Sequence, residues 1–497
     1  TNPLYYYKNK NNFGISNNVW RLAEIFSDEI EIDEASLKSQ LVYFVDVVPG
    51  RTMIKDMKRL CAGESLSYDF KTNELDIQVE YEFRYEPDKE INLQEELKRA
   101  DEEFTKYFTY IKNTNKGKKL GFGCSGGLDS RLIAHYSDKV GMDSEYFVIG
   151  DFDNDKFFES VTSLVSGKVA EYYNKEIKKI AYSEKWMERS MLLDIRNNPF
   201  FFSQVFLNPV DELPEYDFHI SGDPGGVAYL AAPIIEGEDE LVKKHADYYL
   251  TLRKYAMPGV SDFIRKASHH LGLKLDPYED KGIGGLDHSR LDGIMGKEMI
   301  EEARQEFYDV IDKAPGNNSV EKWYYIHDNI TTGYMNASGY TSMSKTKPNY
   351  MLYYPYFYEQ IKHFPGEYML NKMFLKKLLY YVNPIYAIIP DQNLNSIKSH
   401  KNPISKALNR AELALRGRGL NILRMMKTKT YRSKVKEVFS RSNPVFEKFV
   451  NVDLLLRNGI MTNYAGAQLL KLKMVADIIY NKEFGRLVGI KDFEIAG

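Results

Sequence analysis

The chain has 497 residues, which is too long for one hydrophobic core, so we expect two or three domains. Its formal net charge of −3 argues neither for nor against nucleic-acid binding, and no nucleic-acid partner is expected. The two cysteines, Cys61 and Cys124, are too few for a cysteine metal cluster and favour a reducing, cytoplasmic location. No apolar run reaches the roughly eighteen residues of a membrane span, so none is predicted.

The first 88 residues carry the pattern of an antiparallel sheet. Apolar and polar residues alternate over 4–7 and 13–16, and turn residues interrupt the segments 48–53 and 59–63. We therefore predict that residues 1–88 form an antiparallel domain of strands and turns.

A long helix is predicted to follow this first domain. Asn92 and Glu95 form a capping-box pair at its start. The apolar residues that share one helical face are Leu93, Leu97, Ala100, Phe104, Phe108 and Ile111. The first domain boundary is therefore placed near residue 90.

A turn rich in glycine and hydroxyl groups is the most informative feature of the chain. Residues 119–124 predict a buried parallel strand, and residues 129–136 predict the helix that follows it. Gly126 and Gly127 can take positive φ and leave room for backbone N–H groups to converge on a phosphate. The candidate nucleotide-binding residues of this turn are Gly123, Ser125, Gly126, Gly127, Asp129 and Ser130.

Asp129 adds a metal to this prediction. A carboxylate beside a phosphate would repel it unless a divalent cation lay between them, and Mg²⁺ commonly takes one or two carboxylates together with phosphate oxygens. We therefore predict that Asp129 binds Mg²⁺. The motif is not a Walker A loop, because the Gly-Lys-Ser/Thr ending is absent. The alternative interpretation is an ordinary tight connection between a strand and a helix.

Strands and helices are predicted to alternate after this turn. Residues 146–150 predict a strand, 157–174 a helix, and 177–182 and 216–221 two further extended segments. Such alternation is typical of a parallel sheet with right-handed crossovers, which binds ligands at its strand ends. Residues 230–390 are predicted to be mainly helical and to cover that end.

The segment 401–436 is strongly basic. Its positive residues include Arg410, Arg416, Arg418, Arg424, Lys427 and Lys429, and Leu and Ile lie between them. This pattern predicts an amphipathic helical cover with a solvated face, and the alternative is a patch for an anionic substrate or surface. We expect residues 401–497 to form a helical extension of the preceding domain.

The string Ser-Gly-Gly-Leu-Asp-Ser at 125–130 resembles the pyrophosphate-binding loop of the N-type ATP pyrophosphatases, and its context is similar to the asparagine synthetase family. Residues 146–150 resemble that family's second strand, whose apolar end lies against adenine, which implies this role for Ile149. Residues 215–223 resemble the strand that contacts ATP and the acyl intermediate. The resemblance thereby implies binding roles for Ser221 and Gly222 and a catalytic role for Asp223.

Two later segments extend the resemblance over most of residues 1–400. Residues 353–357 are similar to the family's Arg-X-Pro-Phe box, and residues 372–390 to the helix that follows it. The family places a lysine after this helix to stabilise the intermediate. This implies a catalytic role for Lys398, with Lys401 as the other match.

The chain departs from the family pattern near the expected acceptor site. Gly226 stands where the family has a second metal-binding Asp, and Met351, Tyr353 and Tyr358 stand where it has Glu, Arg and Asp. An aromatic wall in place of charges favours an acceptor other than aspartate. Arg131 replaces the Ser of asparagine synthetases proper, which fits the broader group of related proteins; the other interpretation is a solvated helix residue.

The first domain is similar to the closing half of the class II glutamine amidotransferase domain, an N-terminal-nucleophile glutaminase. Glutamine hydrolysis in that domain uses an N-terminal cysteine, whereas this sequence begins at Thr1. We expect the catalytic half to be missing from the sequence, so either ammonia or glutamine stays open as nitrogen source. A nucleophilic Thr1 is the less favoured alternative.

The resemblance implies an α/β fold in three parts. These are a partial antiparallel α+β glutaminase domain over 1–88, a parallel-sheet ATP-pyrophosphatase (HUP-like) domain over 89–400, and a helical cover over 401–497. The implied activity is ATP- and Mg²⁺-dependent amide formation, in which a small carboxylate is activated as an acyl-adenylate, pyrophosphate leaves and an amine displaces AMP. The alternatives are amidation of a polysaccharide uronate or a peptide carboxylate, and a non-catalytic nucleotide-binding relative. A homodimer is left open.

Overall fold

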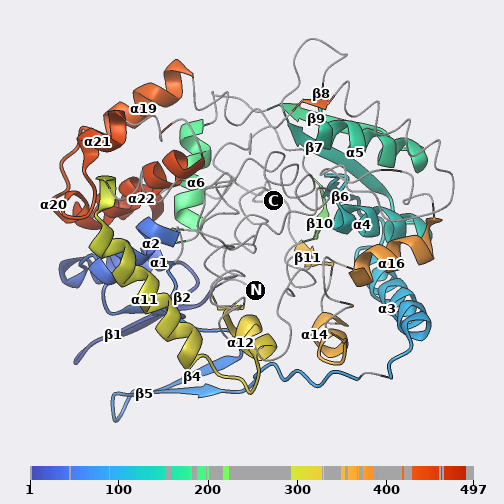
Figure 1. Ribbon diagram of the computed structural model, residues 1–497, viewed down its shortest axis with the longest axis horizontal. Helices are drawn as coiled ribbons and strands as arrows, with labels where there is room; N and C mark the ends of the chain where they lie inside the picture. Colours follow the sequence, from blue (N-terminus) through green and yellow to red (C-terminus); the bar gives the residue numbers. More distant parts are fainter. Residues whose placement is uncertain are drawn as a thin grey trace, which may run out of the picture.

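The structure is a computed structural model. It describes residues 3–43, 46–88, 90–150, 159–181, 187–197, 199–200, 216–222, 293–326, 328–329, 349–352, 356–365, 368, 373–384, 389, 417–418, 428–457, 461 and 464–488. Over these residues the protein is a mixed α/β fold with a parallel sheet and antiparallel sheets (Figure 1), which confirms the predicted fold class at this level.

A parallel sheet of five strands occupies one side of the molecule (Figure 1). Its strands, in spatial order, are β11 (Asn349–Met351), β10 (Phe218–Ser221), β6 (Leu120–Gly123), β7 (Ser144–Gly150) and β9 (Ile177–Ala181). The chain runs outward from β6 through β7 to β9 and then returns to the other side of β6 with β10 and β11, and all four pairings are parallel. The strand order therefore reverses between β6 and β10, which is where open α/β sheets bind ligands.

Four helices accompany this sheet. They are α3 (Leu93–Thr114), α4 (Leu128–Lys139), α5 (Val161–Tyr172) and α16 (Met373–Val382). The α3, α4 and α16 helices contact one another, and α5 contacts β7 and β9. The predicted start of α3 is confirmed, because the Asn92 side chain accepts a hydrogen bond from the Gln94 backbone N–H at 3.0 Å. We call this sheet and these four helices the sheet unit.

The predicted antiparallel sheet of the first residues is also confirmed. The strand β1 (Tyr5–Lys8) lies between β2 (Phe13–Ser16) and β3 (Met57–Arg59), and β4 (Glu64–Asp69) forms a hairpin with β5 (Glu74–Val79). The helices α1 (Val19–Ile25) and α2 (Glu34–Tyr43) were not predicted. The α2 helix buries Ser36, Ser39 and Gln40 beside its apolar residues, so its sequence lacks a clear apolar stripe.

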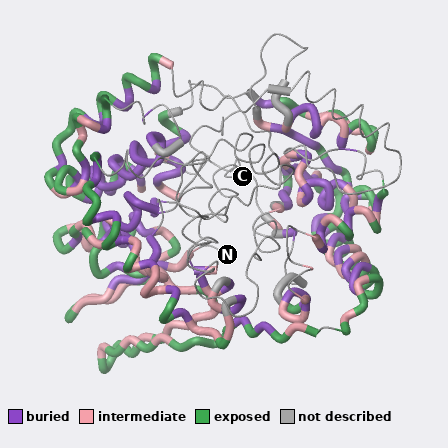
Figure 2. Tube along the Cα trace, in the orientation of Figure 1, coloured by how far each residue is buried: buried purple, intermediate pink, exposed green. Residues whose placement is uncertain are grey.

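Helices from distant parts of the chain pack around α1 and α2. They are α6 (Met187–Asn197), α11 (Lys297–Lys313), α19 (Lys429–Phe439), α22 (Tyr464–Tyr480) and α23 (Gly485–Val488). Trp20 of α1 is fully buried, lies near-parallel to the Phe484 ring with 6.3 Å between centroids, and donates to the Ile195 carbonyl at 3.0 Å. We call β1–β3 and these helices the N/C unit. Figure 2 shows its buried residues concentrated along α22 and α1.

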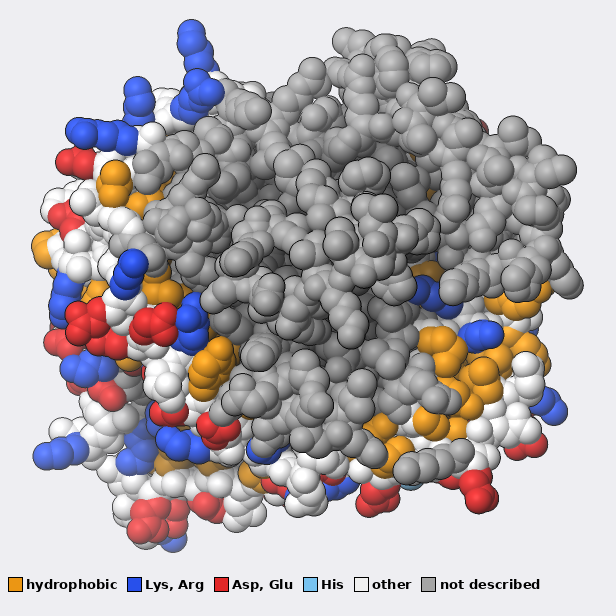
Figure 3. Space-filling model, in the orientation of Figure 1, with side chains coloured by type: hydrophobic (Ala, Val, Ile, Leu, Met, Phe, Trp, Pro, Cys, Tyr) orange, Lys and Arg blue, Asp and Glu red, His pale blue; other side chains and the backbone are white. Residues whose placement is uncertain are grey.

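The remaining elements are short. They are η1 (Ser27–Glu29), β8 (Glu159–Ser160), α12 (Ser319–Ile326), α14 (Tyr356–Ile361), β12 (Gly417–Arg418), α20 (Pro444–Glu447) and α21 (Val452–Arg457). No helix in the described ranges combines the length and apolar character needed to cross a bilayer. Lys/Arg and Asp/Glu side chains intermingle on the visible surface of the N/C unit (Figure 3). The domain limits at 88 and 400 stay predictions.

Candidate functional site

The turn between β6 and α4 depends on glycine at position 126. Gly126 has a φ of 69°, a conformation that glycine adopts without a steric cost. A Cβ atom at this position would lie 2.4 Å from Cγ1 of Val165 on α5. Gly127 differs, because its φ of −71° and ψ of 173° are accessible to any residue. Of the two glycines that can take positive φ, Gly126 therefore does so and Gly127 does not.

The two serines of the turn lie on either side of Gly127. The Ser125 Oγ accepts a hydrogen bond from the Gly127 N–H at 3.2 Å, and the Ser130 hydroxyl donates to the Gly127 carbonyl at 3.1 Å. The two hydroxyl oxygens are 3.4 Å apart. The structure thus brings Ser125 and Ser130 together as predicted, but it points the Gly127 N–H at a hydroxyl of the turn itself.

The first turn of α4 supplies further donors at this place. Gly127 is the N-cap residue and has no side chain to accept from the first N–H groups of the helix. These groups have no partner within a helix, and the helix dipole adds partial positive charge at the same end. The backbone N–H groups of residues 128–130 are therefore the donors that this end of α4 offers to a ligand.

The ends of β6 and β10 meet at Asp129. A Cβ atom at Gly222, directly after β10, would lie 2.6 Å from Cβ of Asp129. This contact is possible only because Gly222 has no side chain. Asp129 and Gly222, two of the predicted site residues, are therefore neighbours where the order of the strands reverses.

Gly123 and Ile149 lie on the neighbouring strands β6 and β7. Gly123 is paired in register with Phe147, whose ring is 3.6 Å from the position of a Cβ at Gly123. Ile149 is half-buried and packs against a small apolar cluster formed by Phe147, Ile180, Leu193 and Tyr216. Ile149 is thus an apolar residue at the end of β7, as predicted, and its contact with a base stays a prediction.

Arg131 is buried, so its interpretation as a solvated helix residue is wrong. Its exposed fraction is 0%. The Nε atom donates to the Gly126 carbonyl at 2.9 Å, and Nη1 donates to the Ile389 carbonyl at 2.7 Å. Sequence reasoning missed this role because a single arginine in a helix gives no sign of what lies beneath it.

Two further side chains support β6 and the turn from inside the protein. Ser166 on α5 is fully buried and donates to the carbonyl of Cys124. Burial raises the pKa of the Cys124 thiol to about 11, so it stays protonated at neutral pH. The buried His219 on β10 contacts the Gly121 carbonyl through Nδ1 at 2.6 Å, and burial lowers its pKa to about 4. These groups are structural supports and not acid–base catalysts near pH 7.

The single carboxylate of Asp129 fits a magnesium ion whose other ligands are phosphate oxygens and water. Within the described ranges, no group of three His, Cys, Asp or Glu side chains converges on one point. Mg²⁺ usually keeps several waters and takes one or two protein carboxylates together with phosphate oxygens. Asp129 at the mouth of an anion-binding turn meets that requirement, so the residues present fit MgATP better than a resident metal cluster.

Several predicted site residues lie outside the described residues. They are Asp223, Lys398 and its alternative Lys401, Gly226, and the residues at 353–355. For Ser221, Met351 and Tyr358 the structure gives the backbone in β10, β11 and α14 and nothing of the side chain. The structure therefore describes the part of the predicted site around the turn at 123–130. The part around Asp223 and Lys398, where the acceptor is expected, stays a prediction.

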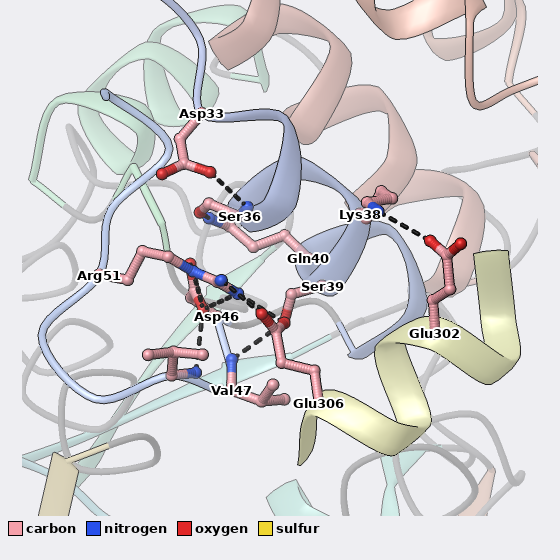
Figure 4. Close-up of polar contacts among 11 residues, drawn as sticks. Asp33, Ser36, Lys38, Ser39, Gln40, Asp46, Val47, Arg51, Glu302 and Glu306 are labelled. Carbon is pink, nitrogen blue, oxygen red and sulfur yellow. Dashed lines mark hydrogen bonds and ion pairs between the residues drawn. The ribbon is translucent and has the colours of Figure 1, made fainter. Parts of the chain in front are cut away.

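A dense charged network lies elsewhere, between α2 and α11 in the N/C unit (Figure 4). Arg51 contacts both carboxylate oxygens of Asp46 through Nε at 2.8 and 2.9 Å and both oxygens of Glu306 through Nη1 and Nη2 at 2.6 and 2.8 Å. Lys38 pairs with Glu302 at 2.8 Å. The network therefore joins α11 both to α2, through Lys38, and to the segment 46–51, through Arg51.

Comparison of the chain with protein-family models and with curated proteins finds no match.

Proposed function

We propose that this protein is an ATP-dependent amide-forming ligase of the asparagine synthetase type. A carboxylate attacks the α-phosphorus of ATP, pyrophosphate leaves, and an amine then displaces AMP from the acyl-adenylate. The observation that carries the proposal is the junction of the Gly126 turn, the N-terminus of α4 and Gly222 around Asp129, at the reversal point of a parallel sheet.

The proposal gives each residue of the turn one task. The N–H groups of residues 128–130 and the hydroxyls of Ser125 and Ser130 bind the pyrophosphate part of ATP. Asp129 holds Mg²⁺, which neutralises charge on the phosphates when bound. Catalysis of this kind consists mainly of positioning and of electrostatic stabilisation of the leaving group. The buried supports around Gly126 keep the turn in place for this purpose.

The remaining predicted parts complete the proposal. Residues 89–400 would be the HUP-like ATP-pyrophosphatase domain, residues 1–88 part of an N-terminal-nucleophile glutaminase domain, and residues 401–497 the helical cover. Ile149 would contact adenine, Ser221 and Gly222 the adenylate, and Asp223 and Lys398 would act in catalysis. The nitrogen donor is ammonia or glutamine, and the expected location is the cytoplasm.

Pyrophosphate release with a panel of carboxylates tests this function. The panel contains aspartate, a uronate and a peptide with a free carboxylate, each with MgATP and ammonium. We expect pyrophosphate release with one class of carboxylate, and AMP as the second product formed from ATP. The aspartate arm tests the asparagine synthetase reaction, and the other two arms test the amidation alternatives.

The matched variants are Asp129→Asn and Asp138→Asn. Both residues are on α4, but Asp138 is exposed near the other end of the helix. Asp129→Asn should lower turnover by about a hundredfold or more, because the site loses its metal ligand, whereas Asp138→Asn should behave as the wild type. Nucleotide binding without pyrophosphate release on any carboxylate would instead identify a non-catalytic relative.

A further inference from the structure

Arg131 makes two hydrogen bonds that have no role in the proposed reaction. Its guanidinium is completely buried, and both acceptors that it reaches through Nε and Nη1 are backbone carbonyls. A buried arginine is uncommon, and desolvation of its charge is costly unless several hydrogen bonds are made. One acceptor, Gly126, belongs to the proposed phosphate-binding turn, and the other, Ile389, lies 258 residues after Arg131.

The bond to Gly126 fixes the direction of a loop amide. The Gly126 carbonyl and the Gly127 N–H belong to one planar peptide group, so holding the oxygen also holds the N–H. On the other side, Val165 fills the space next to Gly126, and Ser166 donates to the Cys124 carbonyl. A movement of the Gly126 peptide group on nucleotide binding would therefore stretch or break its hydrogen bond to the Nε atom of Arg131.

The bond to Ile389 extends this constraint to a second segment. Ile389 is buried, with 6% exposure, in the same hydrophobic core as Phe374 and Leu378 of α16. Its carbonyl receives Nη1 of the same planar guanidinium whose Nε holds Gly126. Since the guanidinium is rigid, the two carbonyls cannot move independently while both bonds exist.

We propose that Arg131 is a positioning residue that couples the shape of the Gly126 turn to the segment at Ile389. Occupation of the turn by nucleotide then stabilises the Ile389 segment, which leads in sequence to Lys398. The catalytic consequence rests on the proposed ligase function, whereas the mechanical link between the two carbonyls does not depend on it.

Two substitutions separate the two bonds. Gln places its amide nitrogen at the position of the arginine Nε, so Arg131→Gln keeps a donor for Gly126 and removes the donor for Ile389. Arg131→Met removes both donors and retains a side chain of similar reach. The matched control is Arg51→Gln in the N/C unit, where a partly buried arginine also bonds two partners, Asp46 and Glu306.

Hydrogen exchange of the peptides that contain Gly126 and Ile389 measures the coupling directly. In Arg131→Gln, the Ile389 peptide should exchange about tenfold faster and the Gly126 peptide at the wild-type rate, whereas Arg131→Met should accelerate both. In the wild type, MgATP should slow exchange at both peptides, and in Arg131→Gln at the Gly126 peptide alone. Equal protection of both peptides by MgATP in Arg131→Gln would overturn the proposal.

The control and the kinetics exclude a general loss of stability. Arg51→Gln should leave exchange at both peptides unchanged, and a change at either one like that in Arg131→Gln would mean that global unfolding is responsible. With an active carboxylate, Arg131→Gln should lower kcat about tenfold with little change in KM for ATP, and Arg131→Met should change both. If no carboxylate is turned over, magnesium pyrophosphate replaces MgATP as the exchange probe. If neither ligand binds the wild type, the ligase proposal fails. The exchange rates of Arg131→Gln and Arg131→Met without ligand then test the coupling between Gly126 and Ile389 by themselves.

Discussion

The sheet unit and the N/C unit bury their polar side chains in different ways. In the sheet unit, Arg131, Ser166 and His219 each contact a backbone carbonyl of β6 or of the turn that follows it. These contacts fix the shape of one short stretch of backbone. They also join parts of the chain that are far apart in sequence, since His219 lies 98 residues from Gly121 and Ile389 lies 258 residues from Arg131.

In the N/C unit the buried charges pair with one another. Lys471 of α22 lies 2.7 Å from the carboxylate of Asp194 on α6, and both side chains are almost fully buried. Lys473 pairs with Asp477 at 2.6 Å within α22 and also donates to a carbonyl. The comparison indicates that buried polar side chains hold one stretch of backbone in the first unit and pair with opposite charges in the second.

The largest effect on stability is expected from Lys471→Met. The change leaves the Asp194 carboxylate buried without its cation, which typically costs about 3–5 kcal/mol. Chemical denaturation should show this loss, while the Kd for MgATP of the folded protein should not change. The control is Lys448→Met, whose exposed pair with Glu34 should contribute less than about 1 kcal/mol. A weakened MgATP affinity in folded Lys471→Met would contradict the claim that this ion pair of the N/C unit acts on stability alone.

The next largest effect is the pH dependence caused by His219. Burial lowers its pKa from 6.5 to about 4, so between these values the unfolded chain binds a proton that the folded chain does not. Stability from this residue is therefore fully present above about pH 6.5 and is lost as the pH falls toward 4, by about 3 kcal/mol in total.

Denaturation of the wild type and of His219→Gln at pH 7 and pH 4.5 measures this contribution. The wild type should lose more stability than the variant over this interval, because Gln has no proton to take up. His135, whose pKa burial also lowers to about 4, is present in both proteins and cancels from the difference. Equal losses in the two proteins would show that His219 is protonated without cost in the folded state.

A smaller effect, on turnover, is expected from a substitution at Gly222, next to Asp129 in the proposed ligand site. Gly222→Ala would place a Cβ 2.6 Å from Cβ of Asp129, so Asp129 must move and turnover should fall about tenfold. Gly167→Ala on α5 meets nothing within 4 Å and should stabilise the helix by about 0.5–1 kcal/mol with unchanged turnover. Melting temperature and initial rate of pyrophosphate release check both variants.

The central part of the sheet unit could be predicted because its pattern is local, whereas the edge strand β11 was not predicted. The segment 93–181 contains strand, turn and helix in direct succession, with periodic apolar residues and an N-cap at Asn92. Gly126 and Asp129 were found from the residue types that a phosphate and a metal require. The sequence could not show that Gly126 alone takes positive φ, because a pair of glycines does not reveal which of them does so.

The helices of the N/C unit could not be predicted for the opposite reason, although its strands β1–β3 lie in the antiparallel sheet that was predicted. The unit is assembled from parts of the chain near the N-terminus, around 187–200 and 297–313, and near the C-terminus. Its buried polar residues, such as Gln40 and Lys471, look like surface residues until their partners are known. The same limit applies to Arg131, whose acceptor Ile389 is far away in sequence.

The most direct test of a phosphate-binding turn is the Kd for MgATP in Gly126→Ala and Gly117→Ala. Both glycines have positive φ, 69° and 76°, so alanine costs about 1 kcal/mol of backbone strain at either position. A Cβ at Gly117 meets nothing within 4 Å, whereas one at Gly126 meets Val165 at 2.4 Å and must displace the turn.

Isothermal titration with MgATP, with both variants shown to be folded by circular dichroism, provides the comparison. We predict that Gly126→Ala raises the Kd about a hundredfold, because the turn loses the shape that presents its donors, and that Gly117→Ala binds as the wild type does. An unchanged Kd in folded Gly126→Ala would contradict the account, since the nucleotide would then bind somewhere other than this turn.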